Sequence, residues 1–379
     1  MAITAIRGKL VTDYEIWSGA AVLVENGTVE ELSREGTVSS EDAELHDYGD
    51  SFLVPGFVDL QVNGCFGIDV ATEPGRLTEL SEKLLSTGVT SYLPTLISSP
   101  EDLYEDVMPV LAASVGEPSG AEYLGAHLEG PFISPQKRGA HPQAFVIPPD
   151  TALLDHWMDL CPVRMITIAP ELPEAEKLIE FATGRGLVVS AGHSEASFED
   201  AYAAFDHRVA GVTHLFNAMN SIHHRKPGVV GAAFAHPRVV CGLIVDGLHI
   251  HPEVAGLAFQ MLGPDRLYLT TDATAATGMG PGEYALATRK IYQDANMVRL
   301  GDGALAGSLI TMNEAFQNIL AFTGCTLPEA ARMASSTPAR LIGEGRRKGR
   351  LVPGYDADIT VLAPDLSVEA VWKNGQKVY

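Results

Sequence analysis

The middle of the chain repeats one pattern eight times, and this repetition limits the possible folds more than any other feature. Short apolar runs alternate with amphipathic stretches in most of the intervals. Continuous Val, Ile and Leu runs are typical of parallel strands that are covered on both faces. The runs are FLVPGFVDLQVN (52–63), TSYLPTLI (90–97), EYLGAHLEG (122–130), VRMITIAPE (163–171), LVVSAGH (187–193), AGVTHLF (210–216), VVCGLIVDG (239–247) and RLYLTTDA (266–273).

The intervening stretches have apolar residues at helical spacing and often end in Gly, which favours a helix terminus. The clearest helices are predicted at 76–88, 175–186, 197–207 and 252–262, with two more at 312–324 and 328–343. Eight strands with crossover helices predict an α/β fold, a (β/α)8 TIM-like barrel. A doubly wound open sheet is the alternative, but no GxGxxG turn follows the first strand to support a dinucleotide site.

The two ends of the chain have a different character from the middle. Residues 20–32 predict a hairpin that turns on Asn26-Gly27, and residues 368–379 predict another that turns on Asn374-Gly375. Two β-rich ends around an α/β centre predict one small β-sandwich domain, built from residues 1–53 and 345–379. The barrel would then occupy residues 54–344.

Charge and cysteine content exclude several classes of protein. The chain has 26 Lys and Arg against 48 Asp and Glu, a net charge of −22, so non-specific binding to nucleic acid or an anionic membrane is not expected. Its four cysteines are far apart without CxxC spacing, which favours free thiols. The first residues lack a signal-peptide pattern, and no apolar run is long enough to span a bilayer. We therefore expect a cytoplasmic protein with a small-molecule partner.

Polar residues follow the predicted strands at the end where barrel enzymes place their chemistry. Two histidines and a carboxylate form a common ligand set for a catalytic divalent ion, and Glu129, His193 and His214 supply this set from three strands. Each residue alone also has a structural explanation, such as a cap or a core imidazole. The remaining polar residues at these ends are Gln61, Asn63, Asp246, His249 and Asp272.

Asp272 would complete such a site. A bound metal lowers the pKa of water to about 7, and a neighbouring carboxylate can take the proton during attack. The same acid can return the proton to a leaving nitrogen, which otherwise leaves poorly. Metal, base and acid together predict an amide hydrolase.

Two basic loops follow the predicted ligands in this acidic chain. Residues 130–142 carry Lys137, Arg138 and His141, and residues 216–228 carry His223, His224, Arg225 and Lys226. A local cluster of this kind suggests an anion, with phosphate as the natural candidate. A solvated surface turn is the alternative.

With these residues identified, the chain resembles the N-acetylglucosamine-6-phosphate deacetylase family of the amidohydrolase superfamily. The matching strings run in order over nearly the whole chain. They are PGFVDLQVNGCFG, HLEGPF, KRGAH, AGHSEAS, THLFNAMN, DGLHI, TDATAATG, LAGSLITM and RKGRLVPGYDADITVL. The resemblance implies hydrolysis of N-acetyl-D-glucosamine 6-phosphate to D-glucosamine 6-phosphate and acetate.

The resemblance also implies a role for each matching residue. Glu129, His193 and His214 would hold the metal, Asp272 would be the catalytic acid and base, and His141 would polarise the acetyl carbonyl. Arg225 and His249 would hold the phosphate, with Arg225 reaching the neighbouring subunit of a homodimer. The other expected substrate contacts are Ala140, Asn217, Ala218, Leu305, Ala306 and Gly307.

Gln61 and Asn63 match one branch of the family, which binds a single metal, whereas another branch has His-x-His at these positions and binds two. Amide side chains are poor metal ligands, so one divalent ion per subunit is expected, with Gln61 contacting it through water. Zinc is the first choice, and iron, manganese or cobalt also suit two histidines and a carboxylate. The alternatives for function are deacetylation of another substrate, such as N-acetylgalactosamine 6-phosphate or an N-acyl amino acid, and a non-catalytic sensor of amino-sugar phosphates.

Overall fold

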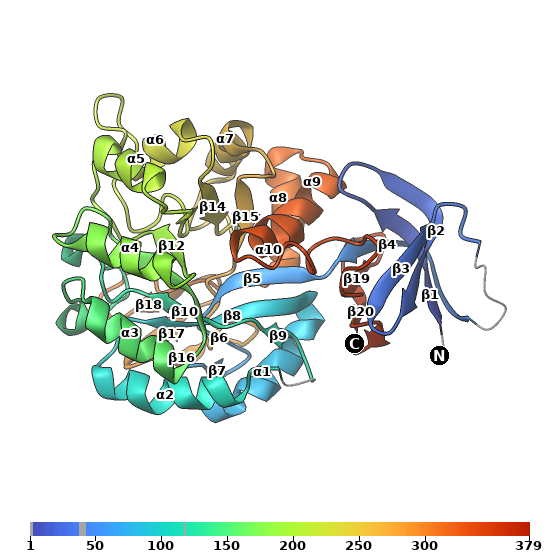
Figure 1. Cartoon of the computed structure of the whole chain (residues 1–379), viewed down its shortest axis with the longest axis horizontal. Helices are drawn as coiled ribbons and strands as arrows, with labels where there is room; N and C mark the ends of the chain where they lie inside the picture. The colour runs from blue at the N-terminus through green and yellow to red at the C-terminus, as the bar shows by residue number, and fades with distance from the viewer. Residues whose placement is uncertain (1–2, 38–42, 117–118) are drawn as a thin grey trace.

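The computed structural model describes residues 3–37, 43–116 and 119–379 and shows a barrel beside a separate sheet (Figure 1). The barrel strands pair in parallel with their neighbours in chain order. They are β5 (Phe57–Val62), β8 (Val89–Ile97), β10 (Ala126–Glu129), β11 (Val163–Ile168), β12 (Val188–Ala191), β13 (Gly211–Val212), β14 (Val240–Leu243) and β15 (Leu267–Leu269). This order confirms the predicted (β/α)8 barrel and differs from that of a doubly wound sheet. The short β9 (Glu122–Tyr123) pairs with the start of β8.

The seam between β15 and β5 nearly closes the barrel. The backbone N–H of Asn63 donates to the carbonyl oxygen of Ala273 over 2.9 Å. Below this contact, the buried Asp59 carboxylate accepts hydrogen bonds from the hydroxyls of Thr270 at 2.9 Å and Thr271 at 2.5 Å. These bonds hold the end of β5 beside the residues that follow β15.

Helices cover the outside of the barrel (Figure 1). They are α1 (Leu77–Leu84), α2 (Glu101–Ala113), α3 (Thr151–Leu160), α4 (Ala175–Gly184), α5 (Phe198–Asp206), α6 (Gly228–Ala235), α7 (Pro252–Leu262) and α8 (Met312–Thr323). The helix predicted at 328–343 is three pieces: α9 (Leu327–Ala331), a π-helical turn (Arg332–Ser336) and α10 (Thr337–Leu341). Pro338 contributes to this break because it has no backbone N–H for a continuous helix. Short 3-10 turns lie at Pro74–Arg76, Leu85–Thr87, Pro135–Lys137 and Gln143–Phe145.

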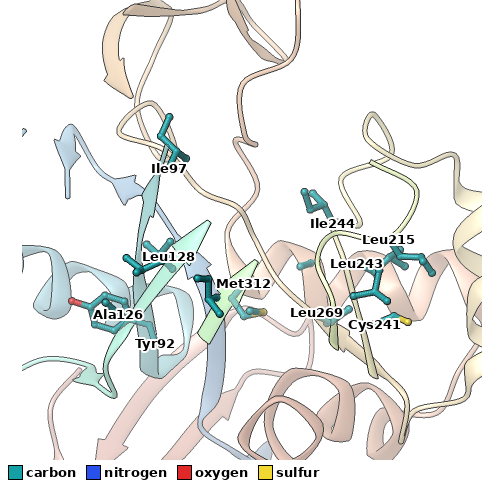
Figure 2. Packing of buried hydrophobic residues seen from close by; sticks show 14 of the residues in the cluster. Tyr92, Ile97, Ala126, Leu128, Leu215, Cys241, Leu243, Ile244, Leu269 and Met312 are labelled. Atoms are coloured by element: carbon teal, nitrogen blue, oxygen red, sulfur yellow. The ribbon is translucent and has the colours of Figure 1, made fainter. Parts of the chain in front are cut away.

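One large apolar cluster fills the space between strands and helices. Figure 2 shows part of it, with Tyr92 of β8 beside Ala126 and Leu128 of β10, and with Leu243 of β14 near Leu269 of β15. These five side chains are fully buried. Close packing of this kind keeps the strand ends in fixed positions, which a catalytic site requires.

The two ends of the chain form one hydrogen-bonded sheet where we expected a sandwich. The strands, in spatial order, are β21 (Gln376–Lys377), β20 (Val368–Lys373), β19 (Ile359–Leu362), β4 (Glu44–Pro55), β1 (Thr4–Val11), β2 (Ile16–Glu25) and β3 (Thr28–Ser33). Both predicted hairpins are present, and their turn residues have positive φ, as type I′ turns require: 52° and 84° at Asn26 and Gly27, 47° and 71° at Asn374 and Gly375. The boundaries at 53/54 and 344/345 stay a prediction.

The apolar run at 52–63 contributes the end of a strand to the terminal sheet and a strand to the barrel. It splits at Gly56, with its first residues ending β4 and the rest forming β5. A Cβ at position 56 would lie 2.2 Å from Oγ1 of Thr90, so only glycine allows the chain to pass there.

A buried ionic cluster joins the barrel to this sheet. Nζ of Lys348 lies 2.7 Å from Oε2 of Glu122, 3.0 Å from Oδ2 of Asp356 and 2.6 Å from Oδ2 of Asp358. Arg347 adds contacts of 2.6 Å to Glu122 and 2.8 Å to Asp356. We refer to these five residues as the Lys348 cluster.

A small antiparallel sheet that the sequence did not predict lies between β15 and α8. Its strands are β16 (Gly282–Leu286), β17 (Arg289–Gln293) and β18 (Val298–Leu300), and a two-stranded pair, β6 (Gly64–Cys65) and β7 (Ile68–Asp69), follows β5. After β18 the chain turns back, and Arg299 forms a bridge with Leu305. This return brings residues 305–307 to the carboxyl ends of the strands.

Two expectations from composition concern the whole chain. All four cysteines are buried free thiols. Among the described residues, no helix has the length and apolar character needed to cross a membrane. The cytoplasmic location stays a prediction.

Candidate active site

Three of the predicted ligands meet at the carboxyl ends of the barrel strands. Glu129 is the last residue of β10, and His193 and His214 each lie two residues beyond β12 and β13. The three side chains are buried, and their ligand atoms all lie within 4.8 Å of one another. A shared end of neighbouring strands thus gathers residues that are far apart in the sequence.

The carboxylate of Glu129 stands between the two imidazoles. Its Oε1 lies 3.0 Å from Nε2 of His193 and 2.9 Å from Nε2 of His214, and the two Nε2 atoms are 3.1 Å apart. Burial acts to raise the pKa of Glu129, but the imidazoles of His141, His193 and His214 outweigh burial and bring it well below its usual range. Glu129 is therefore a carboxylate.

The hydrogen-bonding of His193 shows that this arrangement suits a cation. Nδ1 of His193 lies 2.8 Å from the carbonyl oxygen of Lys137, and a carbonyl can only accept, so Nδ1 carries the hydrogen. In the neutral ring, Nε2 then has a lone pair directed at the Glu129 oxygen. This lone pair and the carboxylate repel each other unless a cation lies between them. Two imidazoles and one carboxylate are a three-residue ligand set that leaves a position for water.

The backbone is strained at this site. His193, His214 and Asp272 have φ values of 48°, 31° and 50°, in the left-handed region that residues with a side chain rarely adopt. Such strain persists only where the surrounding structure enforces it, and it clusters at functional sites. Gly307 belongs to this packing, because a Cβ there would lie 2.6 Å from the carbonyl oxygen of Asp272.

Asp272 lies beside the ligand set and is partly buried. Burial and the nearby charge of Glu129 raise the pKa of Asp272. Its Oδ1 accepts hydrogen bonds from the side-chain amides of Gln61 at 3.0 Å and Asn63 at 2.8 Å. An acid that binds its proton more tightly than usual is suited to both take and return a proton near neutral pH.

Gln61 contacts the site directly, where we expected a contact through water. Its Nε2 donates to Oε1 of Glu129 over 2.9 Å as well as to Asp272, so one amide bridges two carboxylates. Asn63 supports the same carboxylate of Asp272. The number of metal ions at the site stays a prediction.

His141 approaches the site from the loop after β10. Its Nε2 lies 3.6 Å from Oε2 of Glu129, and its ring packs edge-on against that of His193, with 4.5 Å between centroids. Its Nδ1 is held by Ser98, the residue that follows β8. His141 is 1% exposed, so its orientation is fixed.

A cavity of about 300 Å³ opens over these groups. Besides the ligands, Asp272 and His141, it is lined by most of the predicted substrate contacts: Ala140, Asn217, Ala218, His249, Leu305 and Gly307. Ala306 is fully buried behind its neighbours. The size suits a small polar molecule.

His249 and Asp246 form a pair at the edge of this cavity. Nδ1 of His249 lies 2.6 Å from Oδ2 of Asp246, and Oδ1 of Asp246 accepts the backbone N–H groups of Leu248 and His249 at 2.8 Å each. Burial acts to raise the pKa of Asp246, but the bonds from His249 outweigh burial and lower it. The carboxylate thus orients an imidazole that could bind an anion.

Arg225 does not enter the cavity of its own chain. It is exposed and lines a separate pocket of about 610 Å³ together with His223, Lys226 and Glu195. His224 is also exposed. The position of Arg225 on an outer loop is what a contact to a second subunit would need.

Three residues that support the site were not predicted from the sequence. Asp59 closes the seam, Ser98 holds His141, and His127 bridges the carbonyl oxygen of Leu60 at 2.9 Å and the hydroxyl of Thr167 at 2.8 Å. Burial lowers the pKa of His127 to about 4. A charged or imidazole residue within an apolar strand was the available signal for Asp59 and His127. Ser98 gave no such signal.

Comparison with known proteins agrees with this geometry. The model of the amidohydrolase family matches residues 52–378. Human N-acetylglucosamine-6-phosphate deacetylase is 40% identical over 350 residues, which cover 89% of this chain and 85% of the human protein. The Bacillus subtilis protein of that name is 34% identical over 369 residues, with 95% and 92% covered.

Solved structures give the same relationship. The N-acetyl-D-glucosamine-6-phosphate deacetylase of Mycobacterium smegmatis superposes with a TM-score of 0.93 at 31% identity, covering 100% of both chains. That of Thermotoga maritima gives 0.89 at 31% identity, with 98% of each chain covered. From the barrel, the ligand set and these matches, the chain belongs to the amidohydrolase family.

Proposed function

We propose that the protein hydrolyses N-acetyl-D-glucosamine 6-phosphate to D-glucosamine 6-phosphate and acetate. The observation that carries the proposal is the convergence of Glu129, His193, His214 and Asp272 on one cavity. Relatives named as deacetylases for this substrate are 34–40% identical to the chain over the aligned residues. A sensor would need the cavity but would not need an acid beside the ligand set.

Each side chain at the site has a separate role in the proposed hydrolysis. A divalent cation held by Glu129, His193 and His214 would act as a Lewis acid and make water more acidic. Asp272 takes one proton as the water oxygen bonds to the acetyl carbon. His141 donates a hydrogen bond to the carbonyl oxygen as negative charge grows on it. Asp272 then protonates the nitrogen as the C–N bond breaks, which gives acetic acid and a free amine, and a proton passes from the acid to the amine to leave acetate and an ammonium group.

One cation per subunit is proposed, with zinc as the first choice and Fe²⁺, Mn²⁺ or Co²⁺ as alternatives. The ligand set suits all four ions. The direct bonds from Gln61 and Asn63 to Asp272 support a single ion, because the amide hydrogens would repel a second cation.

The first experiment measures acetate release from the phosphorylated sugar by metal-stripped protein titrated with zinc. We expect activity to saturate at one equivalent, in parallel with bound zinc measured by elemental analysis. Saturation at two would show that Gln61, Asn63 or Cys65 helps to hold a second ion. If zinc and the other three ions all fail, the sensor hypothesis replaces this one. Rates on N-acetylgalactosamine 6-phosphate and on N-acyl amino acids then define the preferred substrate.

The phosphate site is proposed to contain His249 and, from the second subunit of a homodimer, Arg225. The support is that His249 lines the cavity while Arg225 is exposed on an outer loop. Removal of a charge-assisted bond costs about 1.5–3 kcal/mol, so Arg225→Ala should raise KM for the phosphorylated sugar about 10- to 150-fold. KM for the unphosphorylated sugar should not change. Lys226→Ala is the matched control for a general loss of positive charge, and an equal effect would contradict a specific role.

Mixed dimers test whether Arg225 crosses between subunits. Co-expressed Arg225→Ala and Asp272→Asn chains form dimers in which one site combines an intact Asp272 with an intact Arg225 from its partner. We expect such dimers to recover activity at low substrate concentration. If Arg225 serves its own chain, no site regains both residues and activity stays low.

A further inference from the structure

We infer that Ser98 is a positioning residue that fixes the tautomer of His141, with the ring hydrogen on Nε2. His141 is then a neutral hydrogen-bond donor into the cavity and not a fourth ligand of the cation. The use of that hydrogen in hydrolysis rests on the proposed function. The tautomer itself follows from the contacts of the two residues.

The backbone of Ser98 decides which ring nitrogen carries the hydrogen. Its N–H points at Nδ1 of His141 over 3.1 Å, and its hydroxyl lies 2.8 Å from the same atom. A backbone N–H can only donate, so Nδ1 must offer its lone pair. In a neutral imidazole the hydrogen then lies on Nε2. Ser98 and His141 are at most 1% exposed, so water does not compete for these bonds.

Neighbouring imidazoles at this site therefore have opposite tautomers. His193 donates from Nδ1 to the carbonyl oxygen of Lys137 and directs the lone pair of Nε2 at the ligand set. His141 accepts at Nδ1 and directs a hydrogen from Nε2 towards Glu129, 3.6 Å away. Different backbone partners thus make one ring a ligand and the other a donor.

The space for the Ser98 contact depends on Gly130. A Cβ at position 130 would lie 2.6 Å from Oγ of Ser98 and 3.6 Å from Nδ1 of His141. A larger residue directly after Glu129 would therefore displace the serine from the ring. The glycine lets a ligand and the Ser98–His141 pair occupy adjacent positions.

A fixed donor suits the proposed reaction. When the water oxygen bonds to the acetyl carbon, the electron pair of the carbonyl double bond moves to oxygen, and the Nε2 hydrogen of His141 can stabilise that charge. His141 keeps its hydrogen throughout. The proton that reaches the leaving nitrogen comes from Asp272, which took it from the water.

Nitrogen NMR of the zinc-loaded protein, labelled with ¹⁵N-histidine, tests the tautomer directly. Signals absent from the spectrum of His141→Asn identify this ring. We expect Nε2 to show one-bond coupling to a hydrogen and Nδ1 to have the shift of an unprotonated nitrogen. A hydrogen on Nδ1, or a bare Nε2 bound to zinc, would overturn the inference.

Kinetics test the contribution of the hydroxyl. Ser98→Ala keeps the backbone N–H and the tautomer but loses one of two bonds to the ring, so kcat should fall about 2- to 10-fold with KM unchanged. Ser99→Ala is the matched control, since the Ser99 hydroxyl bonds to the carbonyl oxygen of Ile97 and does not contact His141. Equal kcat values for the two variants would overturn the positioning role. If the wild type releases no acetate, the proposed function fails and the NMR result still decides the tautomer.

Discussion

Within the described part of the chain, the Lys348 cluster and the barrel mouth both gather buried charge, and they are balanced in opposite ways. In the Lys348 cluster, three carboxylates surround an ammonium and a guanidinium at 2.6–3.0 Å. At the barrel mouth, the carboxylates of Glu129 and Asp272 share a single amide from Gln61, and two imidazoles face Glu129. The first cluster contains its own cations, whereas the second gathers electron pairs.

This difference indicates that the Lys348 cluster stabilises the fold, whereas the cluster at the barrel mouth serves the chemistry. Buried ions are stable only when paired, so the Lys348 cluster can hold two parts of the chain together without any further group. The barrel-mouth cluster is complete only with a cation, and one of its acids has a raised pKa. Removal of charge should therefore reduce stability in one cluster and activity in the other.

The largest effect is expected from Asp272→Asn. The variant cannot accept or return a proton, so kcat should fall about 10²–10⁴-fold. Its Oδ1 can still accept the bonds from Gln61 and Asn63, so bound zinc and the thermal midpoint should stay at or above wild-type values. Acetate release, elemental analysis and thermal unfolding measure the three quantities. Turnover within tenfold of wild type would remove Asp272 from the mechanism.

The opposite result is expected from Lys348→Met. This change removes the ammonium that faces Asp358 and leaves Arg347 to pair with Glu122 and Asp356. The loss of one partner from a buried pair costs about 3–5 kcal/mol. Urea unfolding should show a loss of that size, while kcat of the folded protein should stay unchanged. Lys290→Met is the matched control. Lys290 pairs with Glu283 on the surface, with its side chain 71% exposed, and its removal should not shift the midpoint. Equal midpoints for the two variants would contradict the structural role of the cluster.

The sequence predicted the barrel well because its signal is local and repeated. The eight apolar runs, the capped helices and both Asn-Gly turns depend on neighbours in the chain. The β16–β18 sheet was missed because its strands are mostly exposed or half-buried and lack a continuous apolar run. The break of 328–343 into three pieces depends on packing against the barrel, which periodicity does not reveal.

At the site, the sequence predicted which residues meet but not how they bond. Glu129, His193 and His214 were identified by their position at strand ends. The backbone partners of His193 and His141, Lys137 and Ser98, come from other loops and depend on the folded geometry. Gln61 was recognised as a poor ligand, yet its bridge between two carboxylates could not be foreseen from its chemistry alone.

Asp59 is a buried carboxyl group that lies outside both clusters. It is surrounded by hydroxyl and backbone donors, and no cation of the described residues pairs with it. Burial raises its pKa to about 6 although Thr271 and Thr270 oppose the shift. An acid with a higher pKa in the folded state binds its proton more tightly when folded. Its contribution to stability is therefore greatest while it is protonated and falls as the pH rises from about 4 to about 6.

Asp59→Asn should remove this pH dependence with the smallest effect of the three changes. Oδ1 of the new amide can accept the same donors, and the Thr271 hydroxyl, which is the donor to Oδ2, can rotate to accept from the amide N–H. Relative to wild type, the free energy of unfolding of the variant should rise by about 1 kcal/mol between about pH 5 and about pH 7. Subtracting the free energies of unfolding of the two proteins cancels the contributions of the titratable groups that they share. A difference in the free energy of unfolding that stays constant with pH would mean that Asp59 is ionised throughout. Its hydroxyl donors would then stabilise a buried charge as well as the ammonium of Lys348 does.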